Sequence, residues 1–249
     1  MSRSRTPVEH RTTRSHTRRE ARIKAILWDN DGVLCDTERL FFEANRSVLG
    51  PLGIALTREQ YVAWYLEGNH GAWHVLRERG YDEARIAQVR VARDDAYSRL
   101  VSTSSSLCFP GVEQILARLA QRVSMSIVTA SFDEHITLAH RANTVLEHID
   151  HIVARTDRLR PKPHPDAYLY AMDKLGLHPD ECIAVEDSPR GLAAARASGL
   201  RCIVLRTELL AGHAFMGAYR VVDSHRELEI ELDALLENDS TLTSHTSYP

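Results

Sequence analysis

Two aspartates that lie one residue apart, Asp29 and Asp31, are the residues of this chain best suited to chemistry. They follow the short apolar run 23–27, which we predict to be a buried strand. Open α/β sheets place their chemistry at the carboxyl ends of strands, so both carboxylates are expected at such an edge. Two close carboxylates can divide labour, one as nucleophile and metal ligand and the other as proton carrier. Gly32 then lets the chain turn tightly out of the strand.

A hydroxyl-bearing segment, Thr129-Ala130-Ser131, follows a second predicted strand at 123–128. A hydroxyl and free backbone N–H groups at the end of a strand can bind an anion. Serine and threonine are also common helix caps, so this segment does not establish a site by itself.

Lys162 lies in a proline-rich segment, residues 160–166, in a chain that has only two other lysines, Lys24 and Lys174. Each proline favours an extended conformation for the residue before it, so Lys162 is presented from a stiff segment. A surface lysine in a proline-rich loop is the alternative interpretation of this segment.

A second acidic pair, Glu186 and Asp187, follows the predicted strand 183–185. Ser188 and Pro189 suit the N-cap and the first position of the next helix. The helix dipole alone also favours acidic residues there, so the pair does not establish a site by itself. It becomes informative together with the earlier groups at Asp29, Thr129 and Lys162.

The order of these groups resembles the haloacid dehalogenase superfamily, in its phosphatase and β-phosphoglucomutase-like branch with a helical C1-type cap. The stretch 29–38 resembles the first motif of that family, Thr129 the second, Lys162 the third, and Glu186 with Asp187 the fourth. The resemblance covers about residues 22–236. It implies an α/β fold: a Rossmann-like parallel sheet with helices on both faces, plus an inserted small all-α cap domain.

The resemblance also implies roles. Asp29 would attack phosphorus and become an aspartyl-phosphate, and Asp31 would act as general acid and base. Lys162 would complete the catalytic set by neutralising charge. Phosphate contacts would come from Asn30, Thr129, Ala130 and Lys162. Magnesium, a hard cation that prefers oxygen ligands, would be held by Asp29, the Asp31 backbone carbonyl, Asp187, and Glu186 through water.

Strand and helix patterns alternate after Pro110, which predicts a parallel sheet. Beyond the first run, we expect strands at 123–128, 149–153, 183–185, 202–205 and 220–222. Helices are expected at 112–120, 133–142, 166–175, 192–197 and 228–236.

Only helical patterns occur between residues 37 and 108, including an N-cap at Thr57 and helices at about 70–79 and 82–101. The predicted organisation has four parts: a disordered basic tail (1–21), the core domain (22–36 with 109–236), the helical cap (37–108), and a loose C-terminal tail (237–249).

Four cap residues are candidates for substrate contact, because the corresponding turn touches substrate in the family: His70, Trp73, His74 and Arg77. His70 and His74, four apart on a predicted helix, could instead share a metal. They have no acidic or cysteine partner at a recognisable spacing, which favours the surface or cap-lining interpretation.

The composition and charge of the chain exclude some classes of protein. The 249 residues are 43% hydrophobic, as in a globular protein, and no apolar run approaches the roughly 20 residues of a membrane span. The formal net charge is −3, and residues 1–24 hold eight Arg and Lys against two Glu, so the body is acidic. That distribution argues against a nucleic-acid-binding domain. The four cysteines lack CxxC spacing and are expected to be reduced, in a cytoplasmic protein.

The sequence therefore predicts a Mg²⁺-dependent phosphatase acting on a small phosphorylated metabolite such as a sugar phosphate. Asp31 argues against dehalogenation, which has no oxygen leaving group to protonate. The alternative is a β-phosphoglucomutase-like phosphomutase, although Gly71 stands where such mutases carry a cap arginine if Gly68 is the cap-turn glycine. A catalytically silent metabolite-binding protein is a third hypothesis. Asn30, where relatives carry a larger apolar residue, is expected either to point into the sheet or to bond locally.

Overall fold

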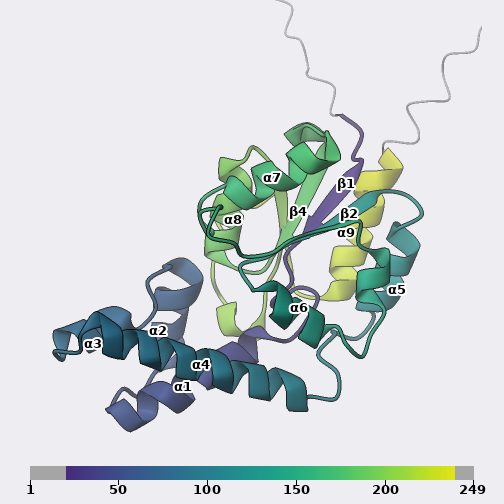
Figure 1. Cartoon of the computed structure of the whole chain (residues 1–249). Coiled ribbons are helices and arrows are strands. Elements are labelled where there is room, and N and C mark those ends of the chain that lie inside the picture. The colour runs from purple at the N-terminus through teal and green to yellow at the C-terminus, as the bar shows by residue number, and fades with distance from the viewer. Residues whose placement is uncertain (1–20, 239–249) are drawn as a thin grey trace, which may run out of the picture.

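A computed structural model describes residues 21–238 and contains one parallel sheet with strand order β3-β2-β1-β4-β5-β6 (Figure 1). The predicted parallel α/β sheet is thereby confirmed. The predicted tails at 1–21 and 237–249 lie almost entirely outside the described residues. The strands are β1 (Ala25–Trp28), β2 (Ser124–Val128), β3 (His151–Val153), β4 (Cys182–Glu186), β5 (Arg201–Leu205) and β6 (Arg220–Val222).

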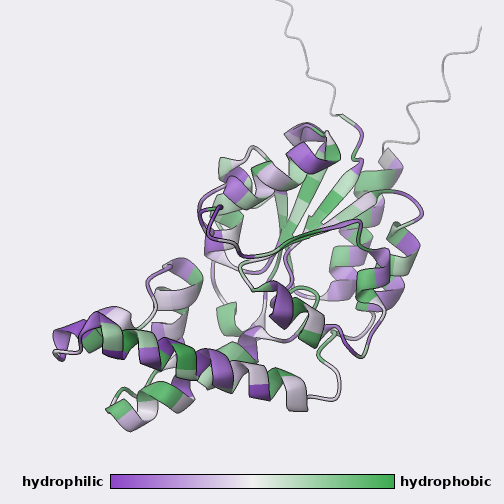
Figure 2. Cartoon of the chain, viewed as in Figure 1, coloured by the Kyte–Doolittle hydropathy of each residue, from purple (hydrophilic) through white to green (hydrophobic). Residues whose placement is uncertain are grey.

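Alternate residues of the strands enter two different cores, because successive side chains point to opposite faces of a sheet. Leu27 packs with the residues of α7 and α8, whereas Ile26 and Trp28 pack with those of α5 and α9. The strands are accordingly hydrophobic along their length, while the outer helix faces are hydrophilic (Figure 2). The helices of the α/β part are α5 (Val112–Leu119), α6 (Asp133–Ala139), α7 (Asp166–Leu175), α8 (Pro189–Ala197) and α9 (His225–Asn238).

A helical insertion separates β1 from β2, and we call its residues 38–103 the cap. It forms a separate group of helices beside the sheet (Figure 1). Described residues between 38 and 103 contain no strand. The predicted domain boundaries at 36/37 and 108/109 stay predictions. The cap elements are α1 (Glu38–Leu49), η1 (Gly50–Leu52), α2 (Arg58–Tyr61), the π-helix η2 (Val62–Glu67), α3 (Trp73–Glu78) and α4 (Glu83–Thr103).

Local sequence explains where the cap helices begin. Thr57 accepts the Gln60 N–H while the Gln60 side chain accepts the Thr57 N–H, a capping box that starts α2. The predicted helix at 70–79 is shorter than expected and begins at Trp73. Gly71 ends the preceding turn with φ of 58°, a left-handed conformation that interrupts a helix.

Two chain crossings join the cap to the α/β part, and they lie side by side. The Asp36 N–H donates to the Leu107 carbonyl at 2.8 Å, and the Phe109 N–H donates to the Leu34 carbonyl at 3.1 Å. The cap can therefore pivot about one short pair of linkers. All four cysteines are free thiols, as predicted. The described helices include none with the length and apolar character of a membrane span.

Candidate active site

Four predicted segments meet at one edge of the sheet. Asp29 follows β1, Thr129 follows β2 and Asp187 follows β4, while Lys162 reaches in from the loop before α7. The Asp29 N–H extends the sheet by donating to the Val185 carbonyl at 2.8 Å. The carboxyl ends of adjacent parallel strands thus bring together groups that are up to 158 residues apart in sequence.

Three carboxylates form a compact acidic cluster: Asp29, Glu186 and Asp187 are all buried, and their ligand atoms lie within 4.8 Å of one another. Glu186 Oε2 and Asp187 Oδ2 are buried without a hydrogen-bond partner. Buried carboxylate oxygens are costly unless paired or coordinated. The donor set is all oxygen, which fits a hard divalent cation such as Mg²⁺.

Lys162 crosses this cluster and is only 3% exposed. Its Nζ lies 2.8 Å from Asp29 Oδ1, 2.6 Å from Glu186 Oε1 and 2.8 Å from the Val128 carbonyl. Burial lowers the pKa of Lys162, but the two carboxylates outweigh it and raise the pKa overall. Lys162 therefore stays protonated, and its single positive charge does not balance all three carboxylates of the acidic cluster.

Burial also raises the pKa of Asp29 to about 8, against the opposing effect of Lys162. The neighbouring carboxylates of Glu186 and Asp31 push the pKa in the same direction as burial. Burial likewise raises the pKa of Asp187, with Asp29 as the next contribution. Shifted pKa values of this kind are typical of functional sites. A bound cation would favour the charged forms of these carboxyls and oppose the effect of burial.

Two glycines leave the room that the carboxylates occupy. A Cβ at Gly32 would lie 2.1 Å from Asp187 Oδ2, and Gly32 has φ of 83°. A Cβ at Gly191 would lie 1.9 Å from Glu186 Oε2. Any larger residue would displace the acidic cluster, so both positions are part of the site.

Asp31 points away from the acidic cluster and accepts hydroxyl donors. Its Oδ2 accepts from Thr129 at 3.0 Å and from Ser131 at 2.7 Å. Its Oδ1 accepts from Thr37 at 2.6 Å and from the Tyr97 hydroxyl of the cap at 3.5 Å. The carboxylate thus sits between the sheet edge and the cap.

The side chain of Asn30 bonds a residue far away in the sequence, so the predicted alternative of a local bond is wrong. Its Oδ1 lies 2.7 Å from Nε2 of buried His140, whose Nδ1 lies 3.0 Å from Asn143 Oδ1. The Asn30 carbonyl accepts the N–H groups of Leu34 and Cys35. Asn30 therefore braces the turn that carries the two aspartates.

A cavity of about 430 Å³ lies between this edge and the cap. Three of the four predicted cap residues line it: His70, Trp73 and Arg77. His74 is not among the lining residues, and its ring packs edge-on against Trp64 and His70. Among the described residues, the acidic cluster is the only set of three His, Cys, Asp or Glu placed to hold a metal.

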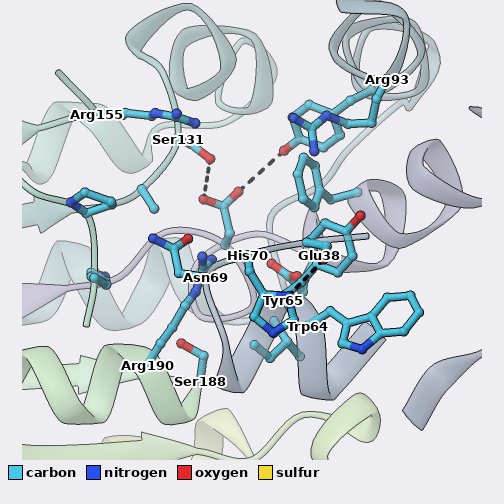
Figure 3. A pocket seen from close by; sticks show the side chains of 18 of the residues that line it. Glu38, Trp64, Tyr65, Asn69, His70, Arg93, Ser131, Arg155, Ser188 and Arg190 are labelled. Atoms are coloured by element: carbon cyan, nitrogen blue, oxygen red, sulfur yellow. Dashed lines mark hydrogen bonds between the residues drawn. The ribbon is translucent and has the colours of Figure 1, made fainter. Parts of the chain in front are cut away.

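Several other residues that line the cavity have no predicted role of their own, although Glu38 and Ser131 lie within the predicted motif segments. Glu38 is buried and accepts the Tyr61 hydroxyl, and burial raises the pKa of its carboxyl. Figure 3 shows Ser131 and Arg155 on one side of the cavity, Arg190 on another and Arg93 on a third. Arg90 also lines the cavity, next to Arg93 along α4. Positions 90, 93 and 97 share one face of a helix, but this spacing does not indicate that the face meets the cavity.

The fold and the site define a class of enzyme, the phosphoric monoester hydrolases that carry an Asp-x-Asp pair on a Rossmann-like sheet. A family model described as haloacid dehalogenase-like hydrolase matches residues 23–199. This chain belongs to that family.

Named relatives match this chain over more than four fifths of its length. Protein CbbY of Cereibacter sphaeroides is 31% identical over 216 residues, covering 83% of this chain and 94% of the relative. Beta-phosphoglucomutase of Bacillus subtilis is 26% identical, with coverage of 84% and 93%. A crystal structure of a CbbY variant from Rhodobacter sphaeroides in complex with xylulose-(1,5)bisphosphate has a TM-score of 0.68 and 29% identity, covering 81% of this chain and 94% of that chain.

Proposed function

We propose that this protein is a Mg²⁺-dependent phosphatase that hydrolyses a small sugar phosphate through an aspartyl-phosphate. The observation that carries the proposal is the buried cluster of Asp29, Glu186 and Asp187 crossed by Lys162, at the floor of a cavity. Such a cluster would be a liability in a protein that only binds metabolites, because its unpaired oxygens cost stability.

The first step assigned to these residues is in-line attack by an Asp29 carboxylate oxygen on phosphorus. A P–O bond forms to Asp29 as the bond to the leaving oxygen breaks. Lys162 and the backbone N–H groups near Ala130 are placed to stabilise charge on the other phosphoryl oxygens. Lys162 is held by Asp29 and the Val128 carbonyl, so it needs little reorganisation during the step.

Asp31 is the proton carrier in this proposal. It would protonate the departing oxygen and then take a proton from the water that attacks the Asp29 phosphoester. In the structure three hydroxyls and the cap Tyr97 occupy its oxygens. Movement of the cap about its two linkers would withdraw the Tyr97 hydroxyl, the one donor of the four that lies on the cap, and open that side of Asp31 to substrate.

Mg²⁺ would be held by Asp29 and Asp187, with Glu186 and the backbone carbonyl of Asp31 completing the predicted set. When bound, the cation would offset negative charge on the transferring phosphoryl group. The orphaned oxygens of Glu186 and Asp187 support this assignment.

A sugar phosphate is the proposed substrate class because a CbbY relative binds a sugar bisphosphate and the mutase relative is named for a sugar phosphate. If Gly68 is the cap-turn glycine, Gly71 stands where such mutases carry a cap arginine, and this favours hydrolysis over phosphoryl transfer between sugars. A cytoplasmic location fits the four free thiols.

The test is release of inorganic phosphate from a panel of sugar phosphates, with Mg²⁺ or with chelator. We expect Mg²⁺-dependent release that Asp29→Asn reduces by about 10⁴-fold or more. Asp36→Asn is the matched control, since Asp36 lies outside the cavity and bonds Arg39 at the surface. Conversion of β-glucose 1-phosphate to the 6-phosphate after bisphosphate priming would favour the mutase. Inactivity in both assays would contradict an enzyme.

A further inference from the structure

His140 is a buried histidine that the proposed chemistry does not use. It is only 3% exposed, follows the last residue of α6 and does not line the cavity. Burial of a polar ring costs stability unless its nitrogens find hydrogen-bond partners. The partners of this ring therefore show what the fold gains from placing a histidine here.

On one side, the ring meets the turn 30–35, which carries Asp31 and follows Asp29. Its Nε2 lies 2.7 Å from Asn30 Oδ1. Cys35 Sγ lies 3.7 Å from Nε2 and 3.8 Å from Nδ1. The side chain thus contacts both the first and the last residue of the turn.

The turn is closed by its own backbone. The Asn30 carbonyl accepts the N–H groups of Leu34 at 2.9 Å and Cys35 at 3.0 Å, and the Gly32 N–H donates to the Cys35 carbonyl at 2.8 Å. Such bonds fix the shape of the turn, whereas its placement beyond the end of β1 depends on contacts from other elements. His140 supplies one of these contacts from a different part of the chain.

On its other side, the ring is attached to a segment that is fixed in the core. Nδ1 lies 3.0 Å from Asn143 Oδ1, and the same oxygen accepts the Val145 N–H at 3.1 Å. Val145 is fully buried and packs in the core that contains the α5 residues. The N–H and hydroxyl of Thr144 both donate to Glu113 of α5. His140 therefore links the turn to a firmly held segment of the α/β part.

The helix α6 reaches the two aspartates from both of its ends. Before its start, Ser131 donates to Asp31 Oδ2 at 2.7 Å, and after its end His140 meets Asn30. The helix lies between the sheet and the cap helix α4 (Figure 1), and His135 Nε2 is 3.0 Å from the Ser98 hydroxyl of α4. The contact with the cap is made by a different residue, so a change at His140 spares it.

We propose that His140 is a positioning residue, which acts through Asn30 to hold Asp29 and Asp31 in the orientation that attack on phosphorus and cation binding require. This inference rests on the proposed function. Displacement of reacting groups by about 1 Å can reduce a rate by about 10²-fold. Loss of the partners that orient metal ligands typically costs about 10-fold to 100-fold in metal affinity or activity.

His140→Leu tests the role in turnover, since it removes the polar contacts and keeps a buried side chain. We expect kcat to fall by about 10-fold to 100-fold. KM should change by no more than about 2-fold, because His140 does not line the cavity. His140→Gln keeps an amide that can donate to Asn30 and should recover most of the lost kcat. His151→Leu is the matched control, since His151 is exposed on β3 and does not line the cavity.

A double-mutant cycle tests whether the effect passes through Asn30. Asn30→Ala, His140→Leu and the double variant are compared at a temperature where circular dichroism shows each of them folded. The double variant should lose about as much kcat as Asn30→Ala alone, because the ring has no other route to the aspartates. Losses that add, or a loss confined to KM, would overturn the positioning role and leave the phosphatase intact.

A binding measurement separates failure of this inference from failure of the proposed function. Calorimetric titration with Mg²⁺ needs no turnover, and His140→Leu should bind Mg²⁺ about 10-fold more weakly than wild type or His151→Leu. If wild type hydrolyses nothing but shows this difference, the positioning role stands and the phosphatase fails. Equal Mg²⁺ affinity in wild type and His140→Leu, or no Mg²⁺ binding by either, would overturn the positioning role whatever the substrate panel shows.

Discussion

The two ends of the cavity differ in how their charged groups are held. At the sheet edge, Lys162 bridges Asp29 and Glu186 at 2.8 and 2.6 Å, and all three are buried. At the cap end, Arg90 and Arg93 rest on aromatic rings and keep most of their donors available. The first arrangement suits a reaction that needs fixed geometry, and the second places cationic side chains along the cavity wall.

The two ends of the cavity tolerate substitution differently. Each group at the sheet edge depends on a buried partner, so removal of one leaves an uncompensated charge. Arg90 is exposed and can be substituted without such a penalty, whereas Arg93 is buried and pairs with Asp94. Changes at the sheet edge should therefore reduce both turnover and stability, whereas changes at the cap end should alter selectivity.

After Asp29→Asn, the largest effect is expected from Lys162→Met. Loss of the ammonium removes a donor to the transferring phosphoryl group, which should reduce kcat by about 10²–10³-fold. It also leaves Asp29 and Glu186 facing each other, which should lower the free energy of unfolding by about 3 kcal/mol in chelator. Steady-state kinetics and urea unfolding measure the two quantities.

Lys174→Met is the control for that variant. Lys174 stacks on Tyr170 at the surface of α7 and contacts no catalytic group. Both variants remove one positive charge from the same part of the molecule. Similar losses in the two would show that charge in general, and not the bridge across the acidic cluster, sustains activity.

Most of the sheet edge could be predicted because three of the four motifs directly follow a strand, and parallel strands end at a common edge. Asp29, Thr129 and Asp187 needed no knowledge of tertiary contacts. The cap end could not be predicted in the same way. Whether Arg90 meets the cavity depends on how the cap packs against the sheet, which no local pattern encodes.

Tertiary structure also explains why the partner of Asn30 and the start of the helix predicted at 70–79 could not be predicted. The partner of Asn30 is His140, 110 residues away, and neither residue carries a local signal of the contact. The predicted helix at 70–79 follows the apolar period correctly but ignores Gly71, whose backbone is left-handed. Hydrophobic periodicity identifies faces and strands, whereas irregular backbone and distant polar pairs come from tertiary structure.

An intermediate effect is expected from Gly32→Ala. A Cβ there would press on Asp187 Oδ2, 2.1 Å away, in a residue with φ of 83°. The left-handed backbone should cost about 1–2 kcal/mol of stability, and displacement of Asp187 should lower kcat by about 10²-fold. Thermal unfolding and phosphate release measure these effects.

Gly80→Ala measures the cost of the left-handed backbone alone, so that the effect of displacing Asp187 can be obtained by comparison. Gly80 has nearly the same φ, 84°, but a Cβ there meets nothing within 4 Å. This variant should lose comparable stability and keep its turnover. If both glycine variants lost activity alike, general destabilisation would account for the result and the contact with Asp187 would be irrelevant.

The smallest effect is a pH dependence of stability that Mg²⁺ should remove. Burial raises the folded-state pKa of Asp29 from its ordinary 3.8 to about 8, so the folded protein binds more protons than the unfolded chain between these values. Stability in chelator should therefore fall as pH rises from 4 toward 8. A bound cation competes with those protons, so the gain in melting temperature from Mg²⁺ should be about 5 °C larger at pH 8 than at pH 6. Asp29→Asn should flatten this difference, because an amide has no proton to lose. A Mg²⁺ gain that was equal at both pH values in the wild type would place the cation away from Asp29, and the contrast between a metal-binding sheet edge and a cationic cap wall would lose its first half.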